Sequence, residues 1–425
     1  MAIQGLRNTT SFDTPGGRRP QNYRETILML YPNGGNLQRA PLTALTAVMK
    51  SESTDDPVYH WFTKKMQDRR FQLGADMGAS TGGTVQNITI TQSAGLASAL
   101  GLKEGDLLYC EQTGEVLYVN VTPSSAVTVN VIRGFTQTPG SATLLLDHDG
   151  VGINPYLKVI GSAYEEGSAA PDPISFDPEE LFNQTQIWRA TYGITGTAAK
   201  TRTRTGDEVR ELKRECLENF SMDMEMGLWF GKKTTTIRNG QPLRTTNGVL
   251  SFIPQSNVKV AAGGILTLGQ LEAWIGDMFR YGATEKMAFC GAGFLTAVNQ
   301  MIRANGDGGS YTLSATTKEY GGFDVRRLNF GQGTLVLKAH PIFSQMTGGT
   351  TGGTAFTSMN NSAVVLDMGN LKYRYLRDRD VKYQTDLQER GIDGLLAGYI
   401  GEAGLEVHHP YTHFMIQGVA SGGAG

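Results

Sequence analysis

Charged residues are scarce in this chain of 425 residues, and neither sign prevails. They make up 18% of the sequence, where about 25% is usual. The 38 Lys and Arg against 40 Asp and Glu leave a net charge of −2. A protein that binds duplex nucleic acid through its net charge has an excess of basic residues. The composition therefore excludes a protein that binds duplex nucleic acid in this way.

Cysteines and long apolar runs are also scarce. Only Cys110, Cys216 and Cys290 occur, and an odd number of widely spaced cysteines argues against a disulfide framework and for a reducing compartment. We interpret all three as small apolar core residues. The chain has no run of about 18 apolar residues, which a membrane-spanning helix needs. Its first residues lack the apolar stretch of a secretory signal. We expect a soluble product made in the cytosol, with no membrane partner.

Signatures of catalysis and metal binding are missing too. His408, His409 and His413 lie close together, but no acid or cysteine stands at ligand spacing in a helix, and Pro410 would break one. The turn at 147–150 opens like a calcium loop but lacks the later carboxylates. Neither glycine-rich stretch of the C-terminal half ends in Gly-Lys-Ser/Thr. The sequence predicts no catalytic residue, no cofactor and no metal site.

Glycine is abundant: 54 of 425 residues, or roughly one in eight where about 7% is usual. We therefore expect many turns and long loops. With 40% hydrophobic residues, the chain is long enough for two or three compact units. Residues 1–50 are polar and punctuated by Pro and Gly, apart from an apolar island at 27–31, which predicts an N-terminal arm. Such an arm cannot bury its own apolar residues, so the island is expected to dock on another surface.

A small all-β domain is predicted at about 85–159. Its β-branched stretches are separated by Gly, Pro and Ser turns and lie at 84–91, 106–111, 115–121 and 126–132. A spacing of about ten residues is typical of a small barrel or sandwich. A connector that contains Glu165 and Glu166 follows.

The clearest helix is predicted from Gly206 to about Phe230. Thr205 stands three residues before Glu208, the spacing of a capping box. Apolar residues at intervals of three and four then define one buried stripe: Val209, Leu212, Cys216, Leu217, Phe220, Met224 and Leu228. Just upstream, threonine and arginine alternate at 201–205, so that the side chains of Arg202 and Arg204 would project from one face of an extended segment.

The C-terminal half is predicted to be α+β. Thr267 caps a helix that runs to Phe279, and a second helix is expected at 294–303. Strands are predicted at 287–290, 323–328, 334–339, 363–368 and 371–376. A dense charge run follows the last of them: Arg374, Arg377, Asp378, Arg379, Asp380 and Lys382. It is either a solvated turn between two strands or a rim of ion pairs between subunits.

The order of these parts resembles the major capsid proteins of tailed bacteriophages, which share the Hong Kong 97-type fold. The stretch Ile160–Ser168, followed by Asn183–Trp188 and Tyr192–Thr197, looks like a branch of that group whose extended loop carries an added β domain. Leu366–Leu376 and Tyr399–Glu406 are also similar to that group.

The resemblance implies an α+β Hong Kong 97-type capsid fold with an inserted small β-barrel or sandwich. The implied parts are an N-terminal arm at 1–50, an extended-loop region at 51–205 with the β domain at about 85–159, a peripheral domain at 206–255 with its spine helix at 206–230, an axial domain at 256–398, and the peripheral return strand and tail at 399–425.

The resemblance also implies a structural protein and not an enzyme. Its copies would form hexamers and pentamers of an icosahedral head shell that encloses double-stranded phage DNA, contacted only non-specifically. The shell would assemble in the host cytoplasm, with portal, scaffolding and decoration proteins as candidate partners. Residues expected at contacts between subunits are Arg202, Arg204, Glu165, Glu166, Arg374, Arg377, Arg379 and Asp380.

Two alternatives stay open at this point. One is a non-viral nanocompartment shell of the same fold, which the residues do not separate from a capsid. The other is an adhesive or carbohydrate-binding virion protein whose β insertion is the binding module. The latter predicts aromatic residues clustered on exposed strand faces, whereas Tyr109, Tyr118, Phe135 and Tyr156 are scattered along 84–160, which disfavours it.

Overall fold

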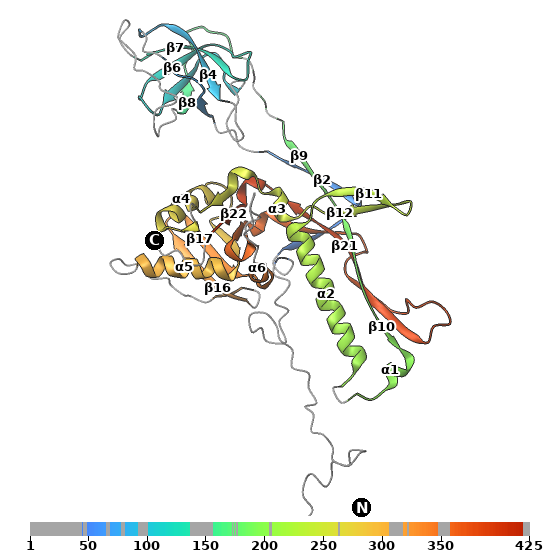
Figure 1. Ribbon diagram of the computed structural model, residues 1–425. Helices are drawn as coiled ribbons and strands as arrows, with labels where there is room; N and C mark the ends of the chain where they lie inside the picture. The colour runs from blue at the N-terminus through green and yellow to red at the C-terminus, as the bar shows by residue number, and fades with distance from the viewer. Residues whose placement is uncertain are drawn as a thin grey trace, which may run out of the picture. The chain divides into compact units, whose positions relative to one another are not determined.

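The computed structural model describes most of the chain, which falls into two compact units (Figure 1). One unit comprises the described residues up to Trp61 and from Leu181 onward, and the other those from Phe62 to Glu180. The apolar island at 27–31, the turn at 147–150, Arg204 and Thr205 lie outside the described residues. The described residues are 45, 49–64, 69–77, 81–91, 101–136, 156–171, 173, 175, 177–203, 206–261, 264–305, 318–320, 323–346 and 358–419.

The smaller unit is a closed barrel of six strands in the order β3-β4-β7-β6-β5-β8, with every neighbouring pair antiparallel. Alternate side chains point inward: Leu117 and Val119 are fully buried, whereas Tyr118 between them is half-buried. Closure leaves no strand edge unpaired. The strands are β3 (Arg70–Leu73), β4 (Val85–Thr91), β5 (Asp106–Cys110), β6 (Val116–Val121), β7 (Thr128–Ile132) and β8 (Tyr156–Ser162).

The strands predicted for β4, β5, β6 and β7 are confirmed. The barrel is nevertheless larger than the predicted 85–159, because β3 precedes that range and β8 ends beyond it. These two strands pair with each other and so complete the ring. Their contact joins residues more than 80 positions apart, for which local sequence patterns carry no signal.

A fully buried ion pair lies inside the barrel unit. Arg133, just after β7, donates from Nε and Nη2 to the two carboxylate oxygens of Glu115, at 2.9 and 2.8 Å. The side chains are 0% and 2% exposed. Gly134 N–H donates to the same carboxylate at 2.8 Å. A buried charge is tolerated only when it is paired and hydrogen-bonded, and here both conditions are met.

In the larger unit, a five-stranded sheet has the order β1-β19-β21-β10, with β20 also paired to β21. Strand β1 runs parallel to β19, and the other pairs are antiparallel. All ten residues of β10 pair with β21. The strands are β1 (Lys50–Thr54), β10 (Gln186–Thr195), β19 (Leu371–Leu376), β20 (Lys382–Gln384) and β21 (Gly394–Val407).

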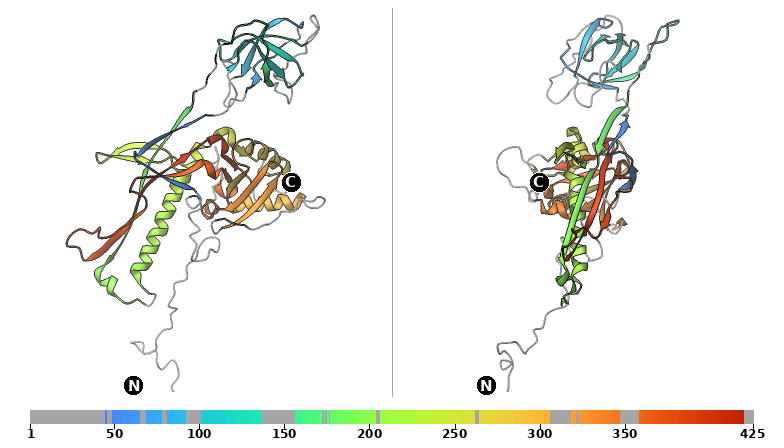
Figure 2. Two further views of the ribbon diagram at one scale, coloured as in Figure 1. Left: turned by 180° about the vertical axis from the view of Figure 1, so that it is seen from behind. Right: turned by 90° about the vertical axis from the view of Figure 1, so that its right-hand side faces the viewer.

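The long helix α2 (Glu208–Phe230) packs against β10 and β21, as Figures 1 and 2 show. The predicted helix is confirmed, but it begins two residues later than the predicted Gly206. Its N-cap is Asp207, whose side chain accepts a hydrogen bond from the Val209 N–H. The predicted cap, Thr205, lies outside the described residues. Glu208 and Glu211 in the first turn suit the positive end of the helix dipole.

The predicted apolar stripe of α2 turns inward at most of its positions. Cys216, Phe220, Met224 and Leu228 are buried, and Val209 and Leu212 are half-buried against β10 and β21. Leu217 differs, with a side chain that is 40% exposed. The first half of α2 packs on β10 and β21, whereas its last turns, with Trp229, enter a core shared by both sheets of the unit. Leu217 stands on the flank that this sheet does not cover.

The core at the end of α2 also holds the end of the predicted arm. Leu45 is fully buried, and its backbone N–H donates to Glu225 of α2 at 2.7 Å. The same carboxylate oxygen accepts the Trp229 indole N–H at 3.1 Å and lies 3.3 Å from the His340 imidazole. Because one buried carboxylate contacts these three groups, the chain at residue 45 is anchored in its own core.

A seven-stranded mixed sheet in the larger unit has the order β13-β22-β18-β14-β17-β16-β15. Helices α4 (Leu268–Met278) and α5 (Ala292–Asn305) share an apolar core with its central strands. Thr267 forms a capping box with Gln270 at the start of α4, so the predicted cap is confirmed. The strands are β13 (Val258–Val260), β14 (Glu285–Cys290), β15 (Lys318–Tyr320), β16 (Phe323–Phe330), β17 (Gly333–Ala339), β18 (Ala363–Leu366) and β22 (Phe414–Gln417).

The two sheets draw strands from several of the predicted domain ranges, and the domain division itself stays a prediction. Strands β19 and β20 fall within the predicted axial range 256–398 but belong to the sheet of β10. Strand β22 falls within the predicted peripheral tail but belongs to the seven-stranded sheet. Shorter elements complete the description: β2 (Val58–Thr63) paired with β9 (Glu179–Gln184), β11 (Thr234–Arg238) paired with β12 (Gln241–Thr245), α1 (Gly196–Lys200), α3 (Val249–Phe252) and α6 (Pro341–Gln345).

Candidate assembly interface

Strand β10 lies at the edge of the five-stranded sheet, next to β21 alone among the described strands. Its side chains alternate, with Trp188 and Tyr192 buried and Ile187, Arg189 and Thr191 exposed. An edge strand presents unpaired N–H and C=O groups that readily pair with another chain. Strand β1 is the opposite edge of the same sheet. This sheet therefore offers two edges at which another chain can add.

The charge run around β19 is held together by ion pairs within the chain. Arg374 pairs with Glu52 of β1 at 2.9 Å and with Glu406 of β21. Across the parallel pair, Glu52 stands directly opposite Arg374. The hydrogen bond from Lys372, together with the charge of Arg374, lowers the pKa of the Glu52 carboxyl. Local sequence gave no sign of Glu52 as a partner, because it lies some 320 positions from these cations.

The turn after β19 continues this network. Arg379 pairs with Glu402 at 2.8 Å, and Asp380 accepts a hydrogen bond from the Tyr373 hydroxyl at 3.1 Å. Arg377 lies 3.4 Å from Asp55, but both side chains are more than 70% exposed, so that pair contributes little stability. The run is thus a turn between β19 and β20 whose charges are largely matched within one chain. A role in contacts between subunits stays a prediction.

The other predicted contact residues lie elsewhere. Glu165 and Glu166 are exposed in the turn after β8, in the barrel unit. Arg202 is exposed two residues after helix α1, which ends at Lys200, before the extended segment predicted upstream of α2. Arg204 is outside the described residues. The structure therefore gathers only Arg374, Arg377, Arg379 and Asp380 into one cluster.

An exposed hairpin, β11–β12, was not predicted. All of β11 is exposed, and Ile237 is 76% exposed. The turn is formed by Asn239 and Gly240, both with positive φ, at 52° and 75°. Asn-Gly between two alternating stretches is the strongest short-range hairpin signal, so this signal was present in the sequence. Residues 232–245 contain four cations and no acid, namely Lys232, Lys233, Arg238 and Arg244.

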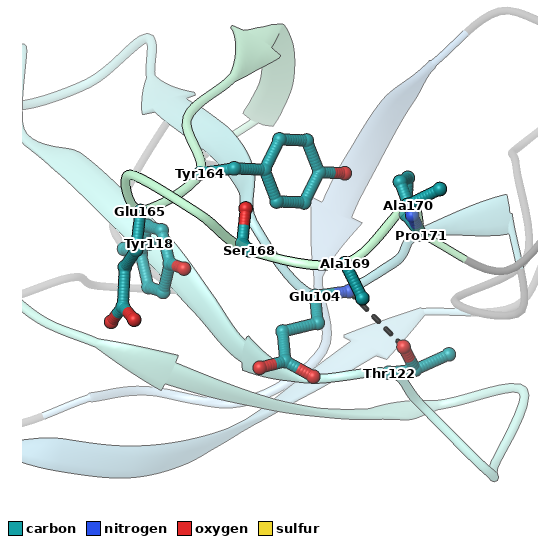
Figure 3. A pocket seen from close by; sticks show the side chains of 9 residues that line it. All are labelled: Glu104, Tyr118, Thr122, Tyr164, Glu165, Ser168, Ala169, Ala170 and Pro171. Carbon is teal, nitrogen blue, oxygen red and sulfur yellow. Dashed lines mark hydrogen bonds between the residues drawn. The ribbon is translucent and has the colours of Figure 1, made fainter.

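A surface pocket of about 310 Å³ lies on the barrel unit. Its lining comes from the turn before β5, from the end of β6 and from the loop after β8 (Figure 3). The Tyr118 ring stacks on Phe135, with centroids 4.8 Å apart, so two of the scattered aromatic residues do meet. Burial, and then the charges of Glu104 and Glu165, raise the pKa of the Tyr118 hydroxyl. The lining residues are Glu104, Tyr118, Thr122, Tyr164, Glu165, Ser168, Ala169, Ala170 and Pro171.

The three C-terminal histidines have different surroundings. His408 hydrogen-bonds to Glu406 and stacks on Trp61 at 6.5 Å. His409 is exposed, with a left-handed φ of 46°. His413 is fully buried, and its Nδ1 accepts the Asp367 N–H at 3.3 Å. Within the described part of the chain, no three or more His, Cys, Asp or Glu side chains are grouped to hold a metal ion.

His413 should make stability depend on pH. Burial lowers its pKa from 6.5 to about 4, against the opposing charge of Asp367. The unfolded chain therefore binds more protons between these values, and stability falls as the pH drops through this window, by about 1.4 kcal/mol per pH unit. We expect His413→Asn to lose this part of the pH dependence, because its amide oxygen accepts the same N–H without titrating. Urea unfolding at pH 7 and pH 5 measures the change in the free energy of unfolding between the two pH values.

The exposed His409 provides the control for this experiment. Because asparagine tolerates positive φ, His409→Asn should retain the wild-type loss of stability between pH 7 and pH 5. Equal losses in the two variants would contradict the assignment of this pH dependence to His413.

Comparison with known proteins gives the family. The sequence model of the SU10 major capsid protein matches residues 6–420. The major capsid protein of Pseudomonas phage PaMx41 is 27% identical over 392 residues, which cover 90% of this chain and 84% of the relative. Of the described helices, none is long and apolar enough to cross a membrane.

Solved capsids are also similar. The capsid of a native GTA particle is 11% identical with a TM-score of 0.48, over 97% of this chain and 99% of that chain. The capsid of Myoviridae phage XM1 is 10% identical with a TM-score of 0.44, over 98% and 99%. Because both TM-scores are below 0.5, the family is assigned from the match of residues 6–420 alone.

The predicted α+β class is confirmed, and the inserted β domain is a closed six-stranded barrel. The family also favours a phage shell over the two alternatives, a nanocompartment and an adhesive protein. The chain therefore belongs to the SU10 major capsid protein family: it is a shell-forming structural protein of a phage virion, and it is not an enzyme.

Proposed function

We propose that copies of this chain join into hexamers and pentamers, which close into an icosahedral head shell around the double-stranded DNA of the phage. The match of residues 6–420 to a phage major capsid family carries this proposal. Assembly would take place in the cytoplasm of the host cell. Portal, scaffolding and decoration proteins are candidate partners of such a shell.

Two features of the single chain support assembly from identical copies. The sheet of β1, β19, β21 and β10 ends in two edges at which another chain can add. The hairpin β11–β12 is a two-stranded ribbon with exposed apolar residues, and such a ribbon is marginally stable on its own. Contacts that join different surfaces of identical chains generate rings when the rotation closes. Neighbouring copies would complete both features.

The arm is the segment that we expect to contact the packaged DNA. Residues 1–44 contain five arginines and two acids, so this segment is basic in a chain whose net charge is −2. Phosphate contacts of this kind are independent of base sequence and weaken as salt rises. We also keep as a proposal the division into an extended-loop region at 51–205 with an inserted β domain, a peripheral domain with α2 as its spine helix, and an axial domain.

Sedimentation velocity and electron microscopy of the purified full-length chain test the proposal. We expect fast-sedimenting closed particles built from rings of five and six, alone or together with the scaffolding and portal proteins of the same phage. A chain that stays monomeric at high concentration under all of these conditions, without rings or shells in the micrographs, would overturn it.

A further inference from the structure

The hairpin β11–β12 is held at its base by Gln184, whose Nε2 donates to the Thr234 and Thr245 carbonyls, while its exposed tip has the properties of a contact element. Its two strands pair only with each other among the described strands. Ile237 and Leu243 are 76% and 44% exposed. Arg238 is the last residue of β11, directly before the Asn239-Gly240 turn, and the structure assigns it no ion pair with a described residue. The tip therefore presents one guanidinium group, and the exposed apolar side chain on the same face of the hairpin is that of Leu243.

The pocket on the barrel unit has the chemistry that receives a guanidinium. Two carboxylates, Glu104 and Glu165, and two phenol rings, Tyr118 and Tyr164, line it (Figure 3). A guanidinium group pairs with carboxylates and also stacks on aromatic faces, which a compact ammonium does less well. The backbone N–H of Glu104 donates to Thr122 at 3.2 Å, which ties the turn that carries one carboxylate to the end of β6.

The charges of the two units are opposite. Residues 62–180 contain seven Lys and Arg and 14 Asp and Glu, a net charge of −7, while the remaining residues contain 31 and 26, a net charge of +5. Together they give the −2 of the whole chain. Within the positive part, the hairpin segment 232–245 carries four cations and no acid. Opposite fields of this kind orient association between copies and select the contacting faces.

We propose that Arg238, at the tip of the β11–β12 hairpin of one copy, inserts into the pocket of Glu104, Tyr118, Tyr164 and Glu165 on the barrel of a second copy. This inference rests on the proposed function, because it needs copies held together in a shell. The hairpin strands bring exposed apolar area to the contact, and the pocket supplies the charge and the aromatic faces. The contact joins different surfaces of two chains, as ring formation requires.

An engineered disulfide tests the contact in assembled particles of the full chain. The native thiols do not interfere, because Cys110, Cys216 and Cys290 are all buried. Gln241 next to the tip and Ser168 in the pocket wall are both exposed. Particles that combine Gln241→Cys copies with Ser168→Cys copies should form disulfide-linked dimers on mild oxidation, and mass spectrometry should find position 241 joined to position 168. A disulfide forms only where Cα atoms approach to about 7 Å or less.

The matched control moves one cysteine to a barrel position that does not line the pocket. Thr84 is exposed, just before β4, and is absent from the pocket lining. Particles that combine Gln241→Cys with Thr84→Cys copies should give roughly tenfold less dimer. In the Gln241→Cys and Ser168→Cys particles, adding Arg238→Glu should lower the yield roughly tenfold, and Arg238→Lys should lower it less.

Two outcomes would overturn the contact. In the first, closed shells form but positions 241 and 168 cross-link no more than the control pair. In the second, Arg238→Glu leaves the cross-link yield unchanged. Failure of the wild-type chain to form any shell would instead count against the proposed function, so the two failures are distinguishable by electron microscopy of the same samples.

Discussion

Phe220→Asp is expected to abolish soluble folding of the chain. The Phe220 side chain is 2% exposed and lies in the core shared by α2 and the five-stranded sheet, with its ring 6.2 Å from that of Tyr399. Aspartate at this position places an unpaired charge in an apolar site and leaves part of the aromatic volume empty. The two effects together exceed about 5 kcal/mol, which is comparable to the whole stability of many domains.

Leu217→Asp, three residues earlier on the same helix, is the matched control. Its side chain is 40% exposed, so the same charge stays in water there and should change stability by less than about 1 kcal/mol. The soluble fraction after expression, followed by thermal unfolding monitored by circular dichroism, separates the two variants. The same loss of soluble protein in both, or a fully soluble and cooperatively folded Phe220→Asp variant, would contradict the described packing of α2.

Glu115→Ala is expected to unfold the barrel and leave the larger unit folded. The substitution leaves Arg133, which is 0% exposed, without its bidentate partner. It also removes the acceptor of the Gly134 N–H. Removing one member of a buried pair typically destabilises by about 3 to 5 kcal/mol, because an uncompensated charge stays buried. Hydrogen exchange of peptides within 70–162 should lose protection, while peptides of β14 and β18 in the larger unit keep theirs.

Glu111→Ala in the same barrel is the control. Glu111 also forms a bidentate pair with an arginine, Arg70, at 2.8 and 2.5 Å, but the two side chains are 37% and 33% exposed. Pairs exposed to this extent contribute about 1 kcal/mol or less. If Glu111→Ala deprotected the barrel as strongly as Glu115→Ala, burial of the Arg133 pair would not be what stabilises the barrel.

Elements with a strong local period were predictable from sequence. Strands β4 to β7 follow alternation in short β-branched stretches, and α4 follows its apolar period and the Thr267 cap. Strand β21 was missed as one element of 14 residues, because its glycines interrupt the alternation. Leu217 was assigned to the buried stripe because periodicity shows which residues share a face, but not how far the neighbouring sheet extends over that face.

The contact surfaces were less predictable than the fold. The charge run around Arg374 was found as a run, but its partners Glu52 and Glu406 are set by the pairing of β1 and β21 with β19, which no local pattern encodes. The pocket on the barrel combines three segments from Glu104 to Pro171. The hairpin β11–β12 was different, because its Asn239-Gly240 signal was readable from the sequence and was missed.

The central claim is that surfaces left incomplete in one copy are completed by others. A cryo-electron microscopy reconstruction of the assembled particle tests it most directly. We predict five-fold and six-fold rings in which density from adjacent subunits lies along the outer edge of β10 and against the β11–β12 hairpin. Shells in which both of these surfaces face open solvent in every subunit would contradict the account.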